Sequence, residues 1–187
     1  MSLSTLDDTM VLLTYSPREG IEATEYEDWL CRVDNPFFNA VPGVLRYTNW
    51  KVAAGMNGLP FSHFDFLELE SPEAFDAVWA NPDLTDFRRQ WRELWGRKPD
   101  QDSPDNSHAY LCRREAGRPQ AMVPIVMLTP DSAGNGEGES WTVLRSLKGG
   151  TQRFERFSLR FLGAETADEP LRAGAIRGDL IAQPPAE

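Results

Sequence analysis

The residues best suited to proton-transfer chemistry are a histidine and an aspartate two positions apart. His63 and Asp65 lie in the apolar segment FSHFDFLELE, which predicts a strand over 61–70. Since side chains alternate across a strand, both point to one face. A desolvated carboxylate within about 4–6 Å raises an imidazole pKa by roughly one to three units. The spacing therefore predicts a general acid/base pair in which Asp65 fixes the tautomer of His63, the alternative being an ordinary surface pair.

The second histidine of the chain, His108, is predicted to lie at the same end of the sheet. It begins a strand over 108–113, whereas Tyr15 closes the first strand, 10–15. In the topology argued below, both histidines start strands that flank this first strand. Two strand spacings of about 4.8 Å put them about 10 Å apart, the width of a small substrate. We therefore expect His108 to act with the pair, and Tyr15 and Tyr110 to contact the substrate.

Polar and aromatic residues on the second predicted strand, 44–53, are further candidates for substrate contacts. Tyr47, Asn49 and Trp50 lie on it, and Asn39 lies in the turn before it. A tryptophan or amide in a cleft can hold an aromatic substrate or donate a hydrogen bond to an enolate oxygen. The alternative is an aromatic core with an amide that caps a helix end.

Periodicity predicts a β-α-β-β-α-β order over the first 115 residues. Apolar strands alternate with two segments whose apolar residues recur every three to four positions. Asn35-Pro36 is predicted to end the first helix and Ser71-Pro72 to begin the second. The predicted strands are 10–15, 44–53, 61–70 and 108–113, and the predicted helices are 22–34 and 71–96. This order is typical of the ferredoxin-like α+β fold.

The third predicted strand is apolar on both faces, which indicates a second layer. Phe64 and Phe66 lie on one face, and Leu67 and Leu69 lie on the other. An antiparallel sheet covered on one side only should be polar on the other. We therefore expect a partner sheet, as in the homodimers of the dimeric α/β-barrel type.

The remainder of the chain, 116–187, is predicted to be a C-terminal extension of the domain formed by 1–115. Strands are expected over 122–128, 154–162 and 171–182. A short amphipathic helix is expected over 139–148, where Trp141, Leu144 and Leu147 share one side. This order fits either a degenerate β-α-β-β repeat or a simple appendage.

Composition excludes several classes of function. The 187 residues carry a formal charge of -10, which argues against nucleic acid and anionic membranes as partners. We expect neither a secretory signal nor a spanning helix, and we expect a cytoplasmic protein. Cys31 and Cys112 form no metal motif and are expected to be reduced core thiols. No Walker loop, GxGxxG or GxSxG motif is present, so we expect no cofactor and no catalytic triad.

Two segments resemble the REDY-like family associated with prodigiosin biosynthesis. They are YEDWLCRVDNPFFNAVPGVLRYTNWKV (26–52) and LPFSHFDFLELESPEAF (59–75). The residues that carry the resemblance are Trp29, Asp34, Pro36, Asn39, Ala40, Val44, Pro60 and Glu68. The resemblance covers residues 10–113 and implies a dimeric α/β-barrel. That superfamily also contains muconolactone isomerases, EthD-like proteins and cofactor-free antibiotic monooxygenases.

Three functional hypotheses follow. The first is a cofactor-independent enzyme, of the cyclase, isomerase or monooxygenase type, that acts on a hydrophobic or aromatic carbonyl compound by proton transfer. The second is a non-catalytic small-ligand-binding or accessory protein of the same fold. The third is haem binding through one histidine, as in the chlorite-dismutase relatives of the superfamily.

Overall fold

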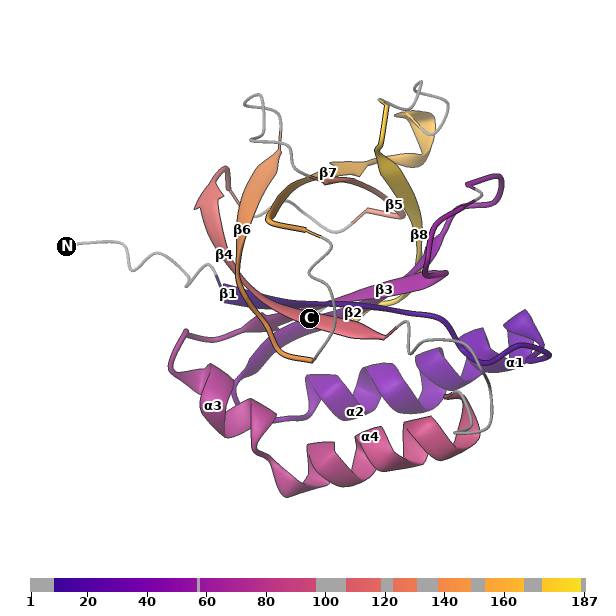
Figure 1. Cartoon of the computed structure of the whole chain (residues 1–187), viewed down its shortest axis with the longest axis vertical. Helices are drawn as coiled ribbons and strands as arrows, with labels where there is room; N and C mark the ends of the chain where they lie inside the picture. Colours follow the sequence, from indigo (N-terminus) through magenta and orange to yellow (C-terminus); the bar gives the residue numbers. More distant parts are fainter. Residues whose placement is uncertain are drawn as a thin grey trace.

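The first half of the chain forms a four-stranded antiparallel sheet with all the α-helices on one face (Figure 1). The computed structural model describes residues 9–56, 58–96, 107–118, 123–130, 138–148, 154–166 and 173–185. The strands of this half are β1 (Thr9–Tyr15), β2 (Val44–Val52), β3 (His63–Leu69) and β4 (His108–Ala116). The helices are α1 (Ala23–Trp29), a π-helix (Leu30–Asp34), α2 (Asn35–Asn39), α3 (Ala74–Trp79) and α4 (Pro82–Leu94). Over these residues the element order is the β-α-β-β-α-β that periodicity predicts.

The predicted fold class is nevertheless wrong, because the sheet closes into a barrel within one chain. The second half supplies β5 (Ile125–Pro130), β6 (Glu139–Ser146), β7 (Arg156–Leu162) and β8 (Ile176–Ala182). The eight strands follow the order β1-β3-β2-β8-β5-β7-β6-β4, and every pair is antiparallel. The second apolar layer that β3 requires therefore comes from the same chain and not from a partner sheet. Whether the chain also forms a homodimer stays a prediction, but this face of the sheet is occupied.

The helix predicted over 139–148 is also wrong. These residues form β6, in which Glu139, Trp141 and Val143 are buried on one face. Leu144 is exposed, so the 3-residue spacing with Trp141 does not mark a buried stripe. Among the described residues beyond β4, the one helical segment is a 3-10 turn (Ala164–Thr166). The β-α-β-β order expected for the extension is therefore not observed.

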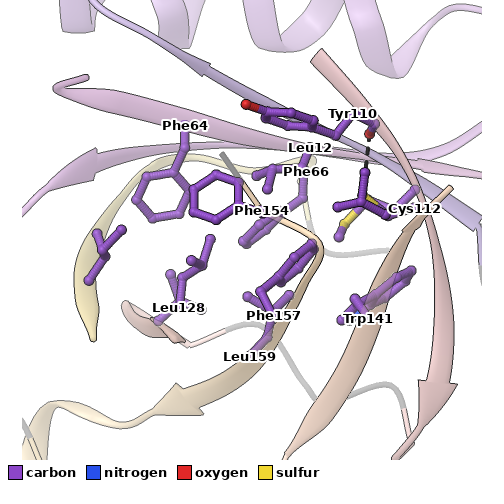
Figure 2. Close-up of a cluster of buried hydrophobic side chains, with 14 of the residues drawn as sticks. Leu12, Phe64, Phe66, Tyr110, Cys112, Leu128, Trp141, Phe154, Phe157 and Leu159 are labelled. Carbon is purple, nitrogen blue, oxygen red and sulfur yellow. Dashed lines mark hydrogen bonds between the residues drawn. The ribbon is translucent and has the colours of Figure 1, made fainter. Parts of the chain in front are cut away.

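Hydrophobic side chains are buried on both faces of the first sheet. Inside the barrel, aromatic and aliphatic side chains from both halves pack together, among them Leu12, Phe64, Phe66, Leu128, Phe157 and Leu159 (Figure 2). Between sheet and helices, Val11, Leu67 and Leu69 pack against Phe38, Phe75 and Leu84. Burying one such side chain contributes about 1.5–3 kcal/mol. Apolar side chains on the two faces of β3 therefore pack into both the barrel interior and the layer under the helices.

The first helical segment does not end at Asn35-Pro36 as predicted. The chain passes through a π-helical turn, in which the N–H of Asn35 donates to the carbonyl oxygen of Leu30, and continues into α2. Pro36 lies in the first turn of α2, where its missing N–H costs nothing. The π-turn leaves Asp34 and Asn35 buried against the sheet. No helix within the described ranges is long and apolar enough to cross a membrane.

Candidate functional site

A cavity of about 280 Å³ lies between the helix-covered face of the sheet and α4. Its sheet wall carries polar groups from Tyr15, Tyr47 and Asp65, and Asp34 adds a second carboxyl from the π-helix. Its other walls are largely aromatic and aliphatic, formed by Leu13, Phe38, Leu67, Trp79, Phe87 and Trp91. An apolar cavity with a few convergent polar groups is the usual form of a small-molecule site.

Asp65 is the centre of the polar wall. Its Oδ2 accepts a hydrogen bond of 2.7 Å from the Tyr47 hydroxyl, and its Oδ1 accepts one of 3.1 Å from the Tyr15 hydroxyl. The three residues come from β3, β2 and β1, which are neighbours in the sheet. All three side chains are buried, so the carboxyl is held rigidly at the cavity.

An asparagine joins Asp65 to the second carboxyl. The amide nitrogen of Asn49 lies 2.8 Å from Asp34 Oδ2, 3.2 Å from Asp65 Oδ1 and 3.2 Å from the Tyr47 hydroxyl oxygen. An amide nitrogen carries two hydrogens, so Asn49 can donate to both carboxyls at once. The side-chain amide of Asn49 thus bridges the two carboxyls.

Burial makes both carboxyls unusually weak acids. It raises the pKa of Asp34 to about 7, against hydrogen bonds from Asn49 and Tyr47 that lower it. Burial, and then the negative charge of Asp34, raises the pKa of Asp65 well above its ordinary value. Burial likewise raises the pKa values of Tyr15 and Tyr47 well above that of free tyrosine. Two carboxylates at one buried site do not ionise together easily, since each disfavours the charged form of the other.

Asn39 supports this cluster from behind. Its amide nitrogen donates to the carbonyl oxygen of Tyr47 at 3.1 Å, and its Oδ1 accepts from the N–H of Tyr47 at 2.8 Å. Asn35 donates to the same carbonyl and to the Asn49 side chain, each at 3.0 Å. Asn39, a candidate substrate contact in the sequence, thus makes contacts that fix the position of β2, and it does not line the cavity.

His63 shares a face with Asp65, but its environment is the opposite of the one predicted. Burial, and then the charge of Lys51, lowers the pKa of His63 to about 4, so the imidazole is neutral. The ring stacks on Tyr15 at a centroid distance of 5.7 Å, and Nδ1 hydrogen-bonds Ser62 Oγ at 2.9 Å. The expected rise of the His63 pKa is therefore wrong. Within the described part of the chain, Asp65 hydrogen-bonds tyrosines and an asparagine and not this histidine.

The structure does not bring the two imidazoles together. His108 pairs with Thr14 across β1 and lies on the barrel side of the sheet, with its ring 6.1 Å from that of Tyr110. It nevertheless contributes to the cavity lining where β4 begins, whereas His63 faces the helices and does not line the cavity. Tyr110 and Trp50 pack inside the barrel and do not line the cavity. Of the predicted site residues, Tyr15, Tyr47, Asp65 and His108 line one cavity.

The sequence interpretation missed Asp34 and the charged residues of α4. Asp34 was noted only within the family resemblance, and Arg88 and Arg92, which also line the cavity, were not considered. No group of three or more His, Cys, Asp or Glu side chains that could hold a metal occurs among the described residues.

Fold and site together define a single-chain α/β barrel with a cavity between its sheet and its helices. Residues 9–101 match the family model of the REDY-like protein HapK, so this segment is similar to the REDY-like family. The resemblance stated from the sequence is therefore confirmed. No curated protein matches the chain. A solved structure described as an anthrone oxidase-like protein is similar over 98% of this chain and 95% of its own, with a TM-score of 0.58 and 10% identity, and shares the fold.

Proposed function

We propose that the chain is an enzyme that transfers a proton on a small aromatic carbonyl compound, with its buried carboxyls as acid and base. The observation that carries this proposal is Asp65, a carboxyl with a raised pKa held at the cavity by Tyr15 and Tyr47, with Asp34 one amide away. In many enzymes two acids act as general acid and general base because their surroundings give them different pKa values. This assigns to the aspartates the role that the sequence assigned to His63.

The roles of the two acids follow from their pKa values. Asp34, with a pKa of about 7, is partly ionised at neutral pH, which suits a general base. It takes the proton from the carbon next to the substrate carbonyl. Asp65, whose pKa burial raises well above its ordinary value, donates a hydrogen bond in its protonated form to the carbonyl oxygen, which becomes an enolate oxygen. The enolate then isomerises, cyclises or reacts with oxygen, which are the reaction types of the first hypothesis drawn from the sequence.

Size and fold support an aromatic substrate. An engineered apolar cavity of about 150 Å³ holds one benzene, so the 280 Å³ of this cavity suits a molecule of about two fused rings. The similar structure is described as anthrone oxidase-like, and an anthrone is an aromatic ketone whose acidic hydrogens lie on the ring carbon opposite the carbonyl, conjugated to it through the aromatic rings. That description agrees with a substrate of this class.

The test is hydrogen exchange on a two-ring ketone. With 1-tetralone in D₂O, the natural protein should accelerate deuterium incorporation next to the carbonyl, as followed by proton NMR. Asp65→Asn and Asp34→Asn should each lower this acceleration by about 100-fold or more. Asp86→Asn removes an exposed carboxylate of α4 whose partner is Arg89, and it should leave exchange unchanged. If 1-tetralone binds but exchange is not accelerated, the protein is a ligand-binding protein and the enzymatic proposal is wrong.

A further inference from the structure

One wall of the cavity carries two arginines. Arg88 and Arg92 lie one turn apart on α4, and both line the cavity. No ion pair joins either of them to an acid among the described residues. Arg89, between them in sequence, lies outside and pairs with Asp86 at 3.1 Å and Glu93 at 3.6 Å. The acids of α4 thus neutralise the outer arginine and leave the two cavity arginines positive.

Arg88 is held in place by its surroundings. Its guanidinium carbon lies 3.8 Å from the centroid of the Trp79 ring, close enough for a cation–π contact. Its Nη2 is buried and has no hydrogen-bond partner within the described residues. A buried charged donor without a partner costs free energy that a ligand acceptor would recover. The stacking on Trp79 fixes the plane of the donors in advance, so little entropy is lost when they bind.

The local charges indicate what this partner should be. Burial, and then the charge of Arg92, lowers the pKa of Arg88, because two like charges one turn apart repel each other. Lys148 adds a third basic side chain to the cavity lining. The acids of the cavity, Asp34 and Asp65, belong to the π-helix and the sheet and not to α4. An anion beside Arg88 and Arg92 would relieve their repulsion.

We propose that the cavity selects aromatic carboxylates, with Arg88 as the residue that binds the carboxylate and Arg92 as its electrostatic support. A guanidinium donates two parallel hydrogen bonds to a planar carboxylate. If the proposed function holds, on which this orientation rests, the bound carboxylate directs the opposite end of the ligand toward Asp65 and Tyr47. The substrate is then an aromatic ketone that also carries an acid group.

The experiment compares two ligands of the same shape and different charge. Isothermal titration calorimetry should show that 2-naphthoate binds to the natural protein at least about 10-fold more tightly than 2-naphthamide. Arg88→Met keeps an apolar side chain over Trp79 but removes the guanidinium, and it should abolish the preference. Arg92→Gln should reduce the preference less. Arg89→Gln is the matched control on the same helix, and it should retain the full preference.

The ratio of the two affinities within each variant keeps the test independent of small changes in stability. Equal affinity of the natural protein for both ligands, or no binding of either, overturns the selection of carboxylates. A preference that survives in Arg88→Met overturns the role of Arg88. Neither result affects the conclusion from the deuterium exchange of 1-tetralone. That ligand is neutral, so its exchange tests the aspartates and not the arginines. Conversely, a preference for 2-naphthoate without exchange leaves the anion site standing and removes the proposed enzyme.

Discussion

Replacing Asp34 by asparagine should make the protein more stable than the natural chain above neutral pH. The Asp34 carboxyl is buried, and its pKa is about 7 in the folded chain against an ordinary value of 3.8. Between these values the folded chain keeps a proton that the unfolded chain releases. The free energy of unfolding therefore falls as the pH rises through this window. Asparagine does not ionise, and its oxygen can still accept the hydrogen bond from Asn49.

The magnitude follows from the two pKa values. A change from 3.8 to about 7, at about 1.4 kcal/mol per pKa unit, corresponds to roughly 4 kcal/mol lost in the natural chain by about pH 8. The variant should recover about 2–4 kcal/mol of this, because some carboxyl contacts are lost with the charge. Removing the Asp34 charge also makes Asp65 easier to ionise, and this adds to the gain.

His63 contributes with the opposite sign and must be separated from Asp34. Its pKa is lowered to about 4 from 6.5, so its contribution to stability is complete above pH 6.5 and is lost as the pH falls toward 4. This contribution is present in the natural chain and in Asp34→Asn alike. The difference between the two proteins therefore isolates the aspartate.

The assay is urea unfolding followed by circular dichroism, in steps from about pH 4 to about pH 8.5, with stability extrapolated linearly to water. The stability difference in favour of Asp34→Asn should grow steadily until about pH 7 and then level off. Asp86→Asn, an exposed carboxylate, should track the natural protein at all pH values. A difference that is constant over the whole range would refute a raised pKa for Asp34.

The remaining predictions concern His63 and the barrel interior. In NMR titrations the His63 ring should stay neutral down to about pH 5. Asp65→Asn should change the His63 pKa little, because burial and the charge of Lys51 determine that pKa. A His63 pKa above 6.5 would contradict this prediction. Gly178→Ala should destabilise the protein by about 1–3 kcal/mol, because the added methyl group would overlap Phe64 and lie 3.0 Å from Val126 Cγ1. Phe64→Leu in the same chain should offset part of this loss, whereas simple addition of the two losses would contradict the contact.

The periodicity of apolar residues was sufficient to predict the secondary structure of the first half of the chain, but not that of the second half. The apolar segments of 10–113 are long, and their periods are clear, so the order of strands and helices is the one predicted, although the first helical segment continues past Asn35-Pro36. Residues 139–148 are short enough to fit both periods, and the burial of Trp141 with Val143 shows that the strand period holds. The two-faced β3 correctly indicated a second layer, but no local pattern says whether that layer belongs to the same chain.

The candidate site shows the same limit. Alternation correctly put His63 and Asp65 on one face, and it did not reveal how deeply that face is buried. Burial shifts both pKa values against the prediction: it lowers the pKa of His63 to about 4 and raises that of Asp65 well above its ordinary value. Asp34 reaches the site because a π-turn carries the helix past Pro36, and proline rules predict a helix end there.

Barrel closure has a consequence for how the chain matures. The seam between β2 and β8 joins residues far apart in the sequence, since Asn49 pairs with Ala182, 133 positions later. While the protein is being synthesised, the sheet of the first half can form with its helices before β8 has left the ribosome. During that interval the side of the sheet that bears Trp50, Phe64 and Phe66 faces solvent, and such surfaces are prone to aggregation. The last strand to emerge is therefore the one that ends this exposure.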